Sequence, residues 1–213
     1  SINLALSNRG IKALRALNLE DDILKISVPM SKRIMHALNG DLTEQPYGRE
    51  GQYIYSVSRQ ELNIKLLNIA ESNSVKLFFE QDCVGVETDE TRLIFNDGYS
   101  IQSDFIFGAD GAGSIVRKTM SSNNSKINVV EQFIDSSYKE LTISANTNGS
   151  HKLDNNGLHI WPRKSFMVIA LPNSDGTFTC TLFAPNSGLK SCVGLLGLAY
   201  LLLGNHEFFL TYS

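Results

Sequence analysis

A short glycine-rich stretch carries the residue types that bind a nucleotide phosphate. It follows an apolar run, Phe105–Phe107, which predicts a buried strand, and precedes a helical pattern through Ile115 and Met120. Gly108-Ala-Asp-Gly111 forms the crossing between them. Glycines at such a crossing let the backbone approach a phosphate, and the first amides of the helix offer N–H groups to an anion. Asp110, at the end of the strand, is placed to accept hydrogen bonds from sugar or polyol hydroxyls.

The same stretch also fits a purely structural interpretation. In that interpretation Asp110 only caps the helix that follows, as aspartates commonly do, and contacts no ligand. A motif this short does not decide between the two interpretations, so the surrounding segments must.

Turn and cap signals place the first elements. Ser7 is a candidate N-cap for an amphipathic helix. Asn39-Gly40 is a strong hairpin signal, which predicts that a strand over residues 31–38 pairs with a return strand running toward Pro46. The hairpin would therefore place the residues before the first strand beside those after the second.

A second helix and several short strands lead to the glycine-rich stretch. Ser58-Arg-Gln-Glu61 is a capping box, and it predicts a helix whose buried face carries Leu62, Leu66 and Ile69. Short strands are predicted over residues 75–80, 84–88, 92–95 and 99–103.

After a polar loop at residues 121–125 the apolar pattern changes to period 2. It predicts the strands of an antiparallel sheet, at residues 138–145, 158–161, 166–171 and 177–183. Alternation places Ile169 and Leu171 on one face of their strand, and Thr181 and Phe183 on one face of theirs. Such a face is more often plain core than a ligand pocket.

Composition excludes several classes of function. The chain has 19 Lys and Arg residues against 22 Asp and Glu, so it lacks the basic stripe that nucleic-acid binding needs. Cys83, Cys180 and Cys192 lie far apart, which predicts neither a zinc site nor a disulfide framework. None of the four histidines stands at a telling spacing from a carboxylate or serine, so a hydrolase or a phosphotransferase has no residues to support it.

Three motifs together resemble one family. Gly-Ala-Asp-Gly-Ala-x-Ser-x-Val-Arg, over residues 108–117, resembles the second flavin-contacting motif of the FAD-dependent aromatic-ring hydroxylases. Pro29-Met30-x-x-Arg33 and Leu158-His-Ile-Trp-Pro-Arg163 further resemble the kynurenine 3-monooxygenase family. The resemblance covers about residues 1–185. It implies a mixed α/β (α+β) fold, in which an incomplete Rossmann-like FAD-binding domain is interleaved with an antiparallel substrate sheet.

The resemblance also implies domain boundaries. Residues 1–120 would form the partial FAD-binding domain, with the hairpin of about residues 28–57 inserted in it. Residues 121–187 would form the substrate sheet. Residues 188–213 make an apolar tail, whose run from Cys192 to Leu203 is shorter than the roughly 20 residues needed to span a bilayer.

The cofactor implied is FAD, with NADPH as co-substrate. The residues that match the family's FAD contacts are Ala5, Arg59, Cys83, Asp110 and Gly111. Arg59 would contact FAD from the first turn of a helix, where a cation opposes the helix dipole, and that misfit favours a functional role. Cys83 would contribute a backbone contact on the adenine side.

The substrate implied is L-kynurenine, which the family hydroxylates to 3-hydroxykynurenine with NADPH and O₂. Arg33 and Tyr47 match the pair that holds the amino-acid carboxylate, and a guanidinium can grip a carboxylate with two parallel bonds. The residues that would line the ring pocket are Leu158, Ile169, Leu171, Thr181 and Phe183. No catalytic side chain and no metal is predicted, because the cofactor carries the chemistry.

The chain also departs from the family pattern. It contains no Gly-x-Gly-x-x-Gly after an initial strand and no Gly-Asp-Ala-Ala-His motif, and Gly113 stands where an aromatic residue is usual. One alternative is therefore a non-catalytic, truncated fragment of the enzyme. Another is a related hydroxylase with a different aromatic substrate, which the pair Arg33 and Tyr47 disfavours. Intact eukaryotic enzymes of the family are anchored in the mitochondrial outer membrane by a carboxyl-terminal segment, and without it this chain is expected to be soluble, or misfolded, in the cytosol.

Overall fold

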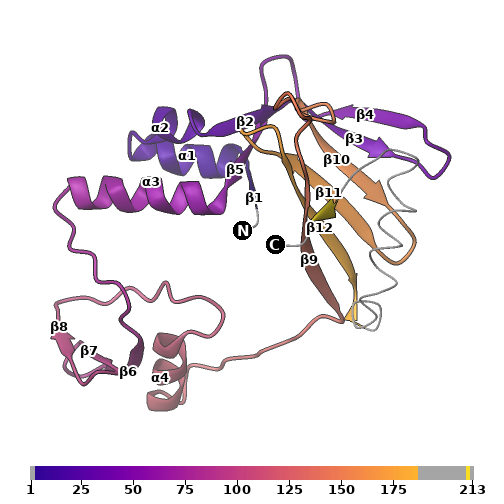
Figure 1. The fold of residues 1–213 in the computed structure, drawn as a ribbon. Coiled ribbons are helices and arrows are strands. Elements are labelled where there is room, and N and C mark those ends of the chain that lie inside the picture. Colours follow the sequence, from indigo (N-terminus) through magenta and orange to yellow (C-terminus); the bar gives the residue numbers. More distant parts are fainter. Residues whose placement is uncertain (1–2, 187–209, 212–213) are drawn as a thin grey trace. The chain divides into compact units, whose positions relative to one another are not determined.

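The computed structural model describes residues 3–186 and 210–211 (Figure 1). The chain divides into two compact units. The larger unit comprises residues 1–72 and 134–213, and the smaller unit comprises residues 73–133. Most of the predicted apolar tail, residues 188–213, lies outside the described residues.

The larger unit contains a three-stranded antiparallel sheet in the order β1-β5-β2. Its strands are β1 (Asn3–Leu6), β5 (Ile54–Ser58) and β2 (Ser27–Met30). The helices are α1 (Asn8–Ala16), α2 (Glu20–Leu24) and α3 (Arg59–Ser72), which Figure 1 shows together beside this sheet. Ser58 Oγ accepts the backbone N–H of Glu61 at 3.4 Å, which is one arm of the predicted capping box. The apolar face predicted for α3 is half-buried rather than buried.

A seven-stranded mixed sheet forms the rest of the larger unit, in the order β13-β9-β12-β11-β10-β3-β4. Its strands are β3 (Lys32–His36), β4 (Leu42–Pro46), β9 (Ser136–Ile143), β10 (Gly157–Pro162), β11 (Met167–Pro172), β12 (Phe178–Pro185) and β13 (Leu210–Thr211). Only β3 and β10 pair in parallel among these strands. The predicted hairpin is present as β3–β4, with Gly40 at a φ of 89°, where glycine is favoured.

The side chains on one face of the seven-stranded sheet form the hydrophobic core. The buried cluster there includes Trp161 of β10, Val168 and Ala170 of β11, and Cys180 and Leu182 of β12. Along each strand the residues between these point to the opposite face, because side chains alternate across a strand. The opposite face is only partly buried, since Ile169 and Phe183 on it are half-buried.

The smaller unit contains a three-stranded antiparallel sheet and one helix. The elements are β6 (Cys83–Glu87), β7 (Arg92–Phe95), β8 (Ser100–Gln102) and α4 (Ile115–Asn123). These agree with the strands predicted over residues 84–88, 92–95 and 99–103. The observed combination of helices, antiparallel sheets and a mixed sheet is the α/β class that was predicted.

Two predicted strands are wrong. Residues 75–80 and 105–107 form no strand, and Phe105 and Phe107 are 78% and 91% exposed. An extended segment becomes a strand only when a neighbour satisfies its amides and carbonyls. Among the described residues no strand pairs with either segment.

Within residues 3–186 and 210–211, no helix is both long and apolar enough to cross a membrane.

Candidate active site

The β3–β4 hairpin brings Arg33 and Tyr47 together. Arg33 lies in β3, and the backbone N–H of Tyr47, just after β4, donates to the Ser31 carbonyl at 3.0 Å. The Arg33 guanidinium carbon lies 5.2 Å from the centre of the Tyr47 ring, within the range of a cation–π contact. Arg33 is exposed and Tyr47 is half-buried. The pair that the sequence predicted from the hairpin is therefore formed, with the cation open to an anion from outside.

Burial determines the protonation state of the Tyr47 phenol. It raises the pKa of Tyr47 above its usual value, and the nearby charge of Arg33 opposes part of that rise. The phenol is therefore protonated at neutral pH and can donate a hydrogen bond.

The predicted pocket residues lie on one face of the seven-stranded sheet. Ile169 of β11 is directly opposite Thr181 of β12, and Met167 is opposite Phe183. Leu158 of β10 is opposite Arg33 of β3. Directly opposite residues point to the same side of a sheet. Because the sequence analysis predicts that these side chains contact the substrate, we call this the substrate face. Its residues are Arg33, Leu158, Ile169, Leu171, Thr181 and Phe183.

The burial of the substrate face suits an aromatic ligand. Leu171 and Thr181 are 3% and 4% exposed, so the middle of the face is covered. Leu158, Ile169 and Phe183 are half-buried and leave apolar surface accessible. A flat apolar ring placed against them would remove that surface from water, which is favourable.

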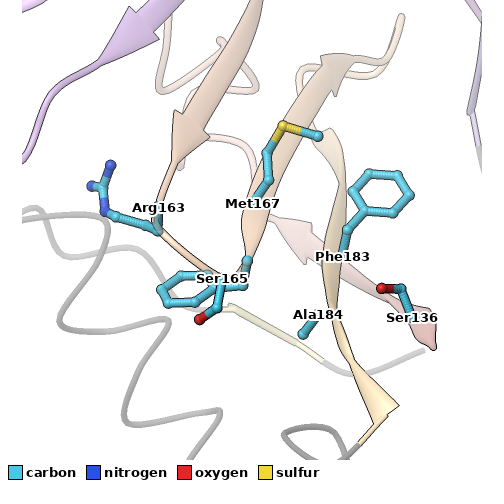
Figure 2. Close-up of a pocket in the computed structure, with 7 residues that line it drawn as sticks. Ser136, Arg163, Ser165, Met167, Phe183 and Ala184 are labelled. Carbon is cyan, nitrogen blue, oxygen red and sulfur yellow. The ribbon is translucent and has the colours of Figure 1, made fainter.

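A pocket of about 230 Å³ lies at one end of this sheet. Figure 2 shows its lining, which is Ser136, Arg163, Ser165, Phe166, Met167, Phe183 and Ala184. Of the predicted substrate residues it includes Phe183, which faces Met167 on the adjacent strand. The pocket is smaller than most ligand sites, which occupy roughly 300–1,000 Å³. The pocket adjoins the substrate face at Phe183.

Two predicted FAD contacts lie on or directly after strands of the three-stranded sheet of the larger unit. Ala5 of β1 is exposed and pairs with Ser56 of β5. Arg59 is exposed and is the first residue of α3, directly after β5. The β1–β5 pairing therefore holds the two segments on one small scaffold.

Asp110, in the smaller unit, caps α4. Its carboxylate accepts the Ser114 hydroxyl at 2.6 Å and the backbone N–H groups of Ile115 at 2.7 Å and Val116 at 3.3 Å. The bond from Ser114, followed by those of the amides, holds the pKa of Asp110 below its usual value. Ser114 in turn accepts the amide of Arg117 at 3.0 Å. The amides of Ile115, Val116 and Arg117 are therefore not left unpaired for a ligand anion, as the sequence suggested, because Asp110 and Ser114 already accept them.

Comparison with known proteins identifies the family. A family model described as an FAD binding domain matches residues 4–184. The chain belongs to this FAD-binding family. It is 50% identical over 196 residues to the kynurenine 3-monooxygenase of Christiangramia forsetii, and 44% identical over 196 residues to that of Flavobacterium johnsoniae. Each match covers 90% of this chain and 44% of the relative, so the chain spans less than half the length of these relatives.

Solved structures share the fold at lower identity. The tetrameric form of 2-methyl-3-hydroxypyridine-5-carboxylic acid oxygenase matches with a TM-score of 0.71 and 20% identity, over 88% of this chain and 49% of that chain. Klebsiella pneumoniae HpxO, solved with FAD and uric acid, matches with a TM-score of 0.66 and 18% identity, over 87% of this chain and 47% of that chain. At these identities the likeness establishes the FAD-binding fold and nothing finer.

The glycine-rich turn of the FAD-binding family leaves room for the cofactor here. Gly111 has a φ of 73°, a conformation that favours glycine. Apart from the adjoining residues, no atom of the described chain lies within 4 Å of where a Cβ would stand on Gly111 or Gly113. The Arg117 guanidinium donates to the carbonyls of Gly111 and Ala112, which fixes the shape of the turn. Asp110 remains exposed, so its oxygens can accept a hydrogen bond from a further hydroxyl group. These residues fit FAD.

Cys83 begins β6 and is half-buried. Its thiol donates to the Gly85 carbonyl at 3.4 Å, where the β6–β7 register shifts. The predicted contacts to FAD thus divide between the units, with Ala5 and Arg59 in the larger and Cys83, Asp110 and Gly111 in the smaller.

Sequence analysis missed one set of polar residues, of which Asn3 and Ser56 are buried and Asn173 and Thr179 are half-buried. Asn3, Ser56, Asn173 and Thr179 are linked by side-chain hydrogen bonds across as many as 176 positions of the chain. The only local signal is a polar side chain in a short strand, as at Asn3, which sequence patterns alone do not distinguish from an exposed position.

Proposed function

We propose that this chain forms the substrate face and part of the flavin site of a kynurenine 3-monooxygenase. That enzyme would hydroxylate L-kynurenine to 3-hydroxykynurenine with NADPH and O₂. The observation that carries the proposal is the substrate face. There the Arg33 guanidinium, in contact with the Tyr47 ring, lies beside an apolar surface against which an aromatic ring could pack. The names of relatives at 44–50% identity support the same substrate.

Arg33 and Tyr47 would bind the amino-acid carboxylate. The guanidinium fork can donate two parallel hydrogen bonds to a carboxylate, which fixes its orientation as well as its position. Contact with the Tyr47 ring restricts the guanidinium before substrate arrives. The protonated phenol would donate a third bond.

The strands β10–β12 would bind the aromatic end. Leu158 stands opposite Arg33, so the apolar surface begins one strand away from the carboxylate clamp. Ile169, Leu171 and Phe183 would cover the ring and exclude water, and Thr181 supplies the one hydroxyl among these five pocket residues. Adjacent strands lie about 4.8 Å apart, so β3 to β11 spans about 10 Å, which suits an amino acid with an aromatic side chain.

FAD, when bound, would supply the redox chemistry that O₂ and NADPH require. The residues that would hold it are Ala5, Arg59, Cys83, Asp110 and Gly111. The exposed carboxylate of Asp110 would accept hydrogen bonds from hydroxyls of the cofactor, and its lowered pKa keeps it ionised at neutral pH. Gly111 would let the cofactor approach the backbone.

The test begins with FAD titrated into the purified chain, followed by flavin fluorescence and absorbance. Saturable binding that Asp110→Ala removes, together with 3-hydroxykynurenine formed from L-kynurenine, would support the proposal. Flavin binding without any response to L-kynurenine would contradict the substrate. A well-folded chain that binds no FAD would support the alternative of a non-catalytic product.

A further inference from the structure

Four polar side chains join the two sheets of the larger unit. Asn3 Nδ2 donates to Ser56 Oγ at 3.0 Å and also to Asn173 Oδ1. Thr179 Oγ1 donates to Asn3 Oδ1 at 3.2 Å. Asn3 and Ser56 are 7% and 1% exposed, so the bond between them is shielded from water, whereas Asn173 and Thr179 are half-buried. We call Asn3, Ser56, Asn173 and Thr179 the inter-sheet network.

Asn173 uses both ends of its side-chain amide in this network. Its Oδ1 accepts from Asn3, while its Nδ2 donates to Thr177 at 2.7 Å and to Thr179 at 3.1 Å. Asn173 follows β11 directly, and Thr177 immediately precedes β12. The residue therefore closes the β11–β12 hairpin and binds it to β1 at the same time.

The inter-sheet network lies next to the proposed ligand contacts on both sides. Thr179 is opposite Leu171 and two residues before Thr181, both of the substrate face. Asn3 is two residues before Ala5 on β1, and residues two apart point to the same side of a strand. Two residues span about 7 Å along a strand. The network thus connects the strand proposed to contact FAD with the strands proposed to contact the ring.

We infer that Asn173 is a positioning residue, which sets where the substrate ring lies relative to FAD by holding β1 against the β11–β12 hairpin. This inference rests on the proposed function. Catalytic geometry is sensitive to such support, since a shift of about 1 Å far from the chemistry can cost roughly a hundredfold in rate. Arg33 lies on β3, two strands from β11, so carboxylate binding should survive the loss of the network.

The positioning role predicts different effects on how tightly the substrate binds and on how often its ring lies where hydroxylation can occur. Without Asn173 the ring would still bind, yet it would stand less often where hydroxylation can occur. The quantity to measure is therefore the amount of 3-hydroxykynurenine formed per NADPH consumed. A residue that only stabilises the fold would change the melting temperature and leave this ratio unaltered.

The experiment compares four variants, without ligands for hydrogen exchange and loaded with flavin for substrate binding and turnover. Asn173→Ala and Thr179→Val remove network bonds, whereas Thr179→Ser keeps the hydroxyl. Thr142→Val is the matched control, because Thr142 pairs with Thr179 across β9 and β12 but is not a member of the network. Three measurements are made: amide hydrogen exchange of Leu4–Leu6 without ligands, the Kd of L-kynurenine from the flavin absorbance change, and product per NADPH.

We expect Asn173→Ala and Thr179→Val to raise the rate of amide exchange in Leu4–Leu6 by about tenfold, which is the effect expected from losing one or two hydrogen bonds. The Kd should stay within about threefold, while product per NADPH falls by at least about threefold. Thr179→Ser and Thr142→Val should match the wild type. If Asn173→Ala does not fold, Thr179→Val decides the question.

Two results would overturn the inference. Faster exchange with an unchanged ratio of product to NADPH would show that the network is only structural. Unchanged exchange in Leu4–Leu6 would show that Asn173 does not hold β1. A wild-type protein that forms no 3-hydroxykynurenine would instead overturn the proposed function, and the positioning role with it.

Discussion

The guanidinium of Arg33 lies over the ring of Tyr47, with 5.2 Å between its carbon and the ring centre. An exposed cation–π contact of this kind contributes about 0.5–1 kcal/mol, enough to restrict a side chain that would otherwise sample many rotamers. The contact depends on the β3–β4 hairpin, which brings residues 14 positions apart to one edge of the sheet. A ligand carboxylate would therefore meet a pre-oriented fork.

Replacing Arg33 with leucine is expected to weaken binding of L-kynurenine by about 1.5–3 kcal/mol, or roughly 10- to 100-fold in Kd. The loss follows from removal of charge-assisted hydrogen bonds to the carboxylate. Spectral titration of the flavin-loaded protein measures it. The decarboxylated analogue of kynurenine is the control and should bind wild type and variant equally. A similar loss of affinity for that analogue would show that Arg33 acts through the fold instead.

Tyr47 combines two effects that a pair of variants can separate. Tyr47→Phe keeps the ring under Arg33 and removes only the phenol, so we expect a loss of about 0.5–1.5 kcal/mol in binding of L-kynurenine. Tyr47→Leu removes both and should cost more. Titration calorimetry of the two variants provides the comparison. If Tyr47→Phe and Tyr47→Leu bind L-kynurenine with equal affinity, the ring does not contribute.

Sequence analysis predicted the parts of the candidate site whose geometry is set by local pairing. Asn39-Gly40 determines a turn, and alternation determines which residues of one strand share a face, so the Arg33–Tyr47 pair and the faces of β11 and β12 could be predicted. The parallel pairing that places Leu158 opposite Arg33 joins segments about 125 positions apart and was not predicted. It did not predict that residues 105–107 would lack a strand partner, since an apolar run does not say which strand, if any, lies beside it. The bond between Asn3 and Asn173 joins residues 170 positions apart, and no local pattern encodes such a contact.

The capping role of Asp110 has a pH dependence. Its folded-state pKa is lowered, so the stabilisation is fully present above the unfolded pKa of about 3.9 and is lost as the pH falls through the lowered value. We therefore expect Asp110→Ala to speed amide exchange at Ile115 and Val116 at neutral pH. The difference from wild type should shrink as the pH falls below about 4. Asp104→Ala, which alters an exposed aspartate upstream, is the control. A difference that stayed constant down to pH 2 would contradict this account.

Alanine variants of Gly111 and Gly113 distinguish the effect of backbone strain from the effect of filling space that a ligand could occupy. Gly111 has a φ of 73°, whereas the φ of Gly113 is not in the left-handed region. Alanine at 111 should therefore cost about 1–2 kcal/mol of stability, and alanine at 113 should cost little. Both methyl groups would point into space that no atom of the described chain fills within 4 Å. If FAD occupies that space, both variants should bind it more weakly although only one is strained. Thermal melts and fluorescence titrations on the two variants measure these quantities separately. Weaker FAD binding by Gly111→Ala alone would mean that the turn's conformation matters and that the cofactor lies elsewhere.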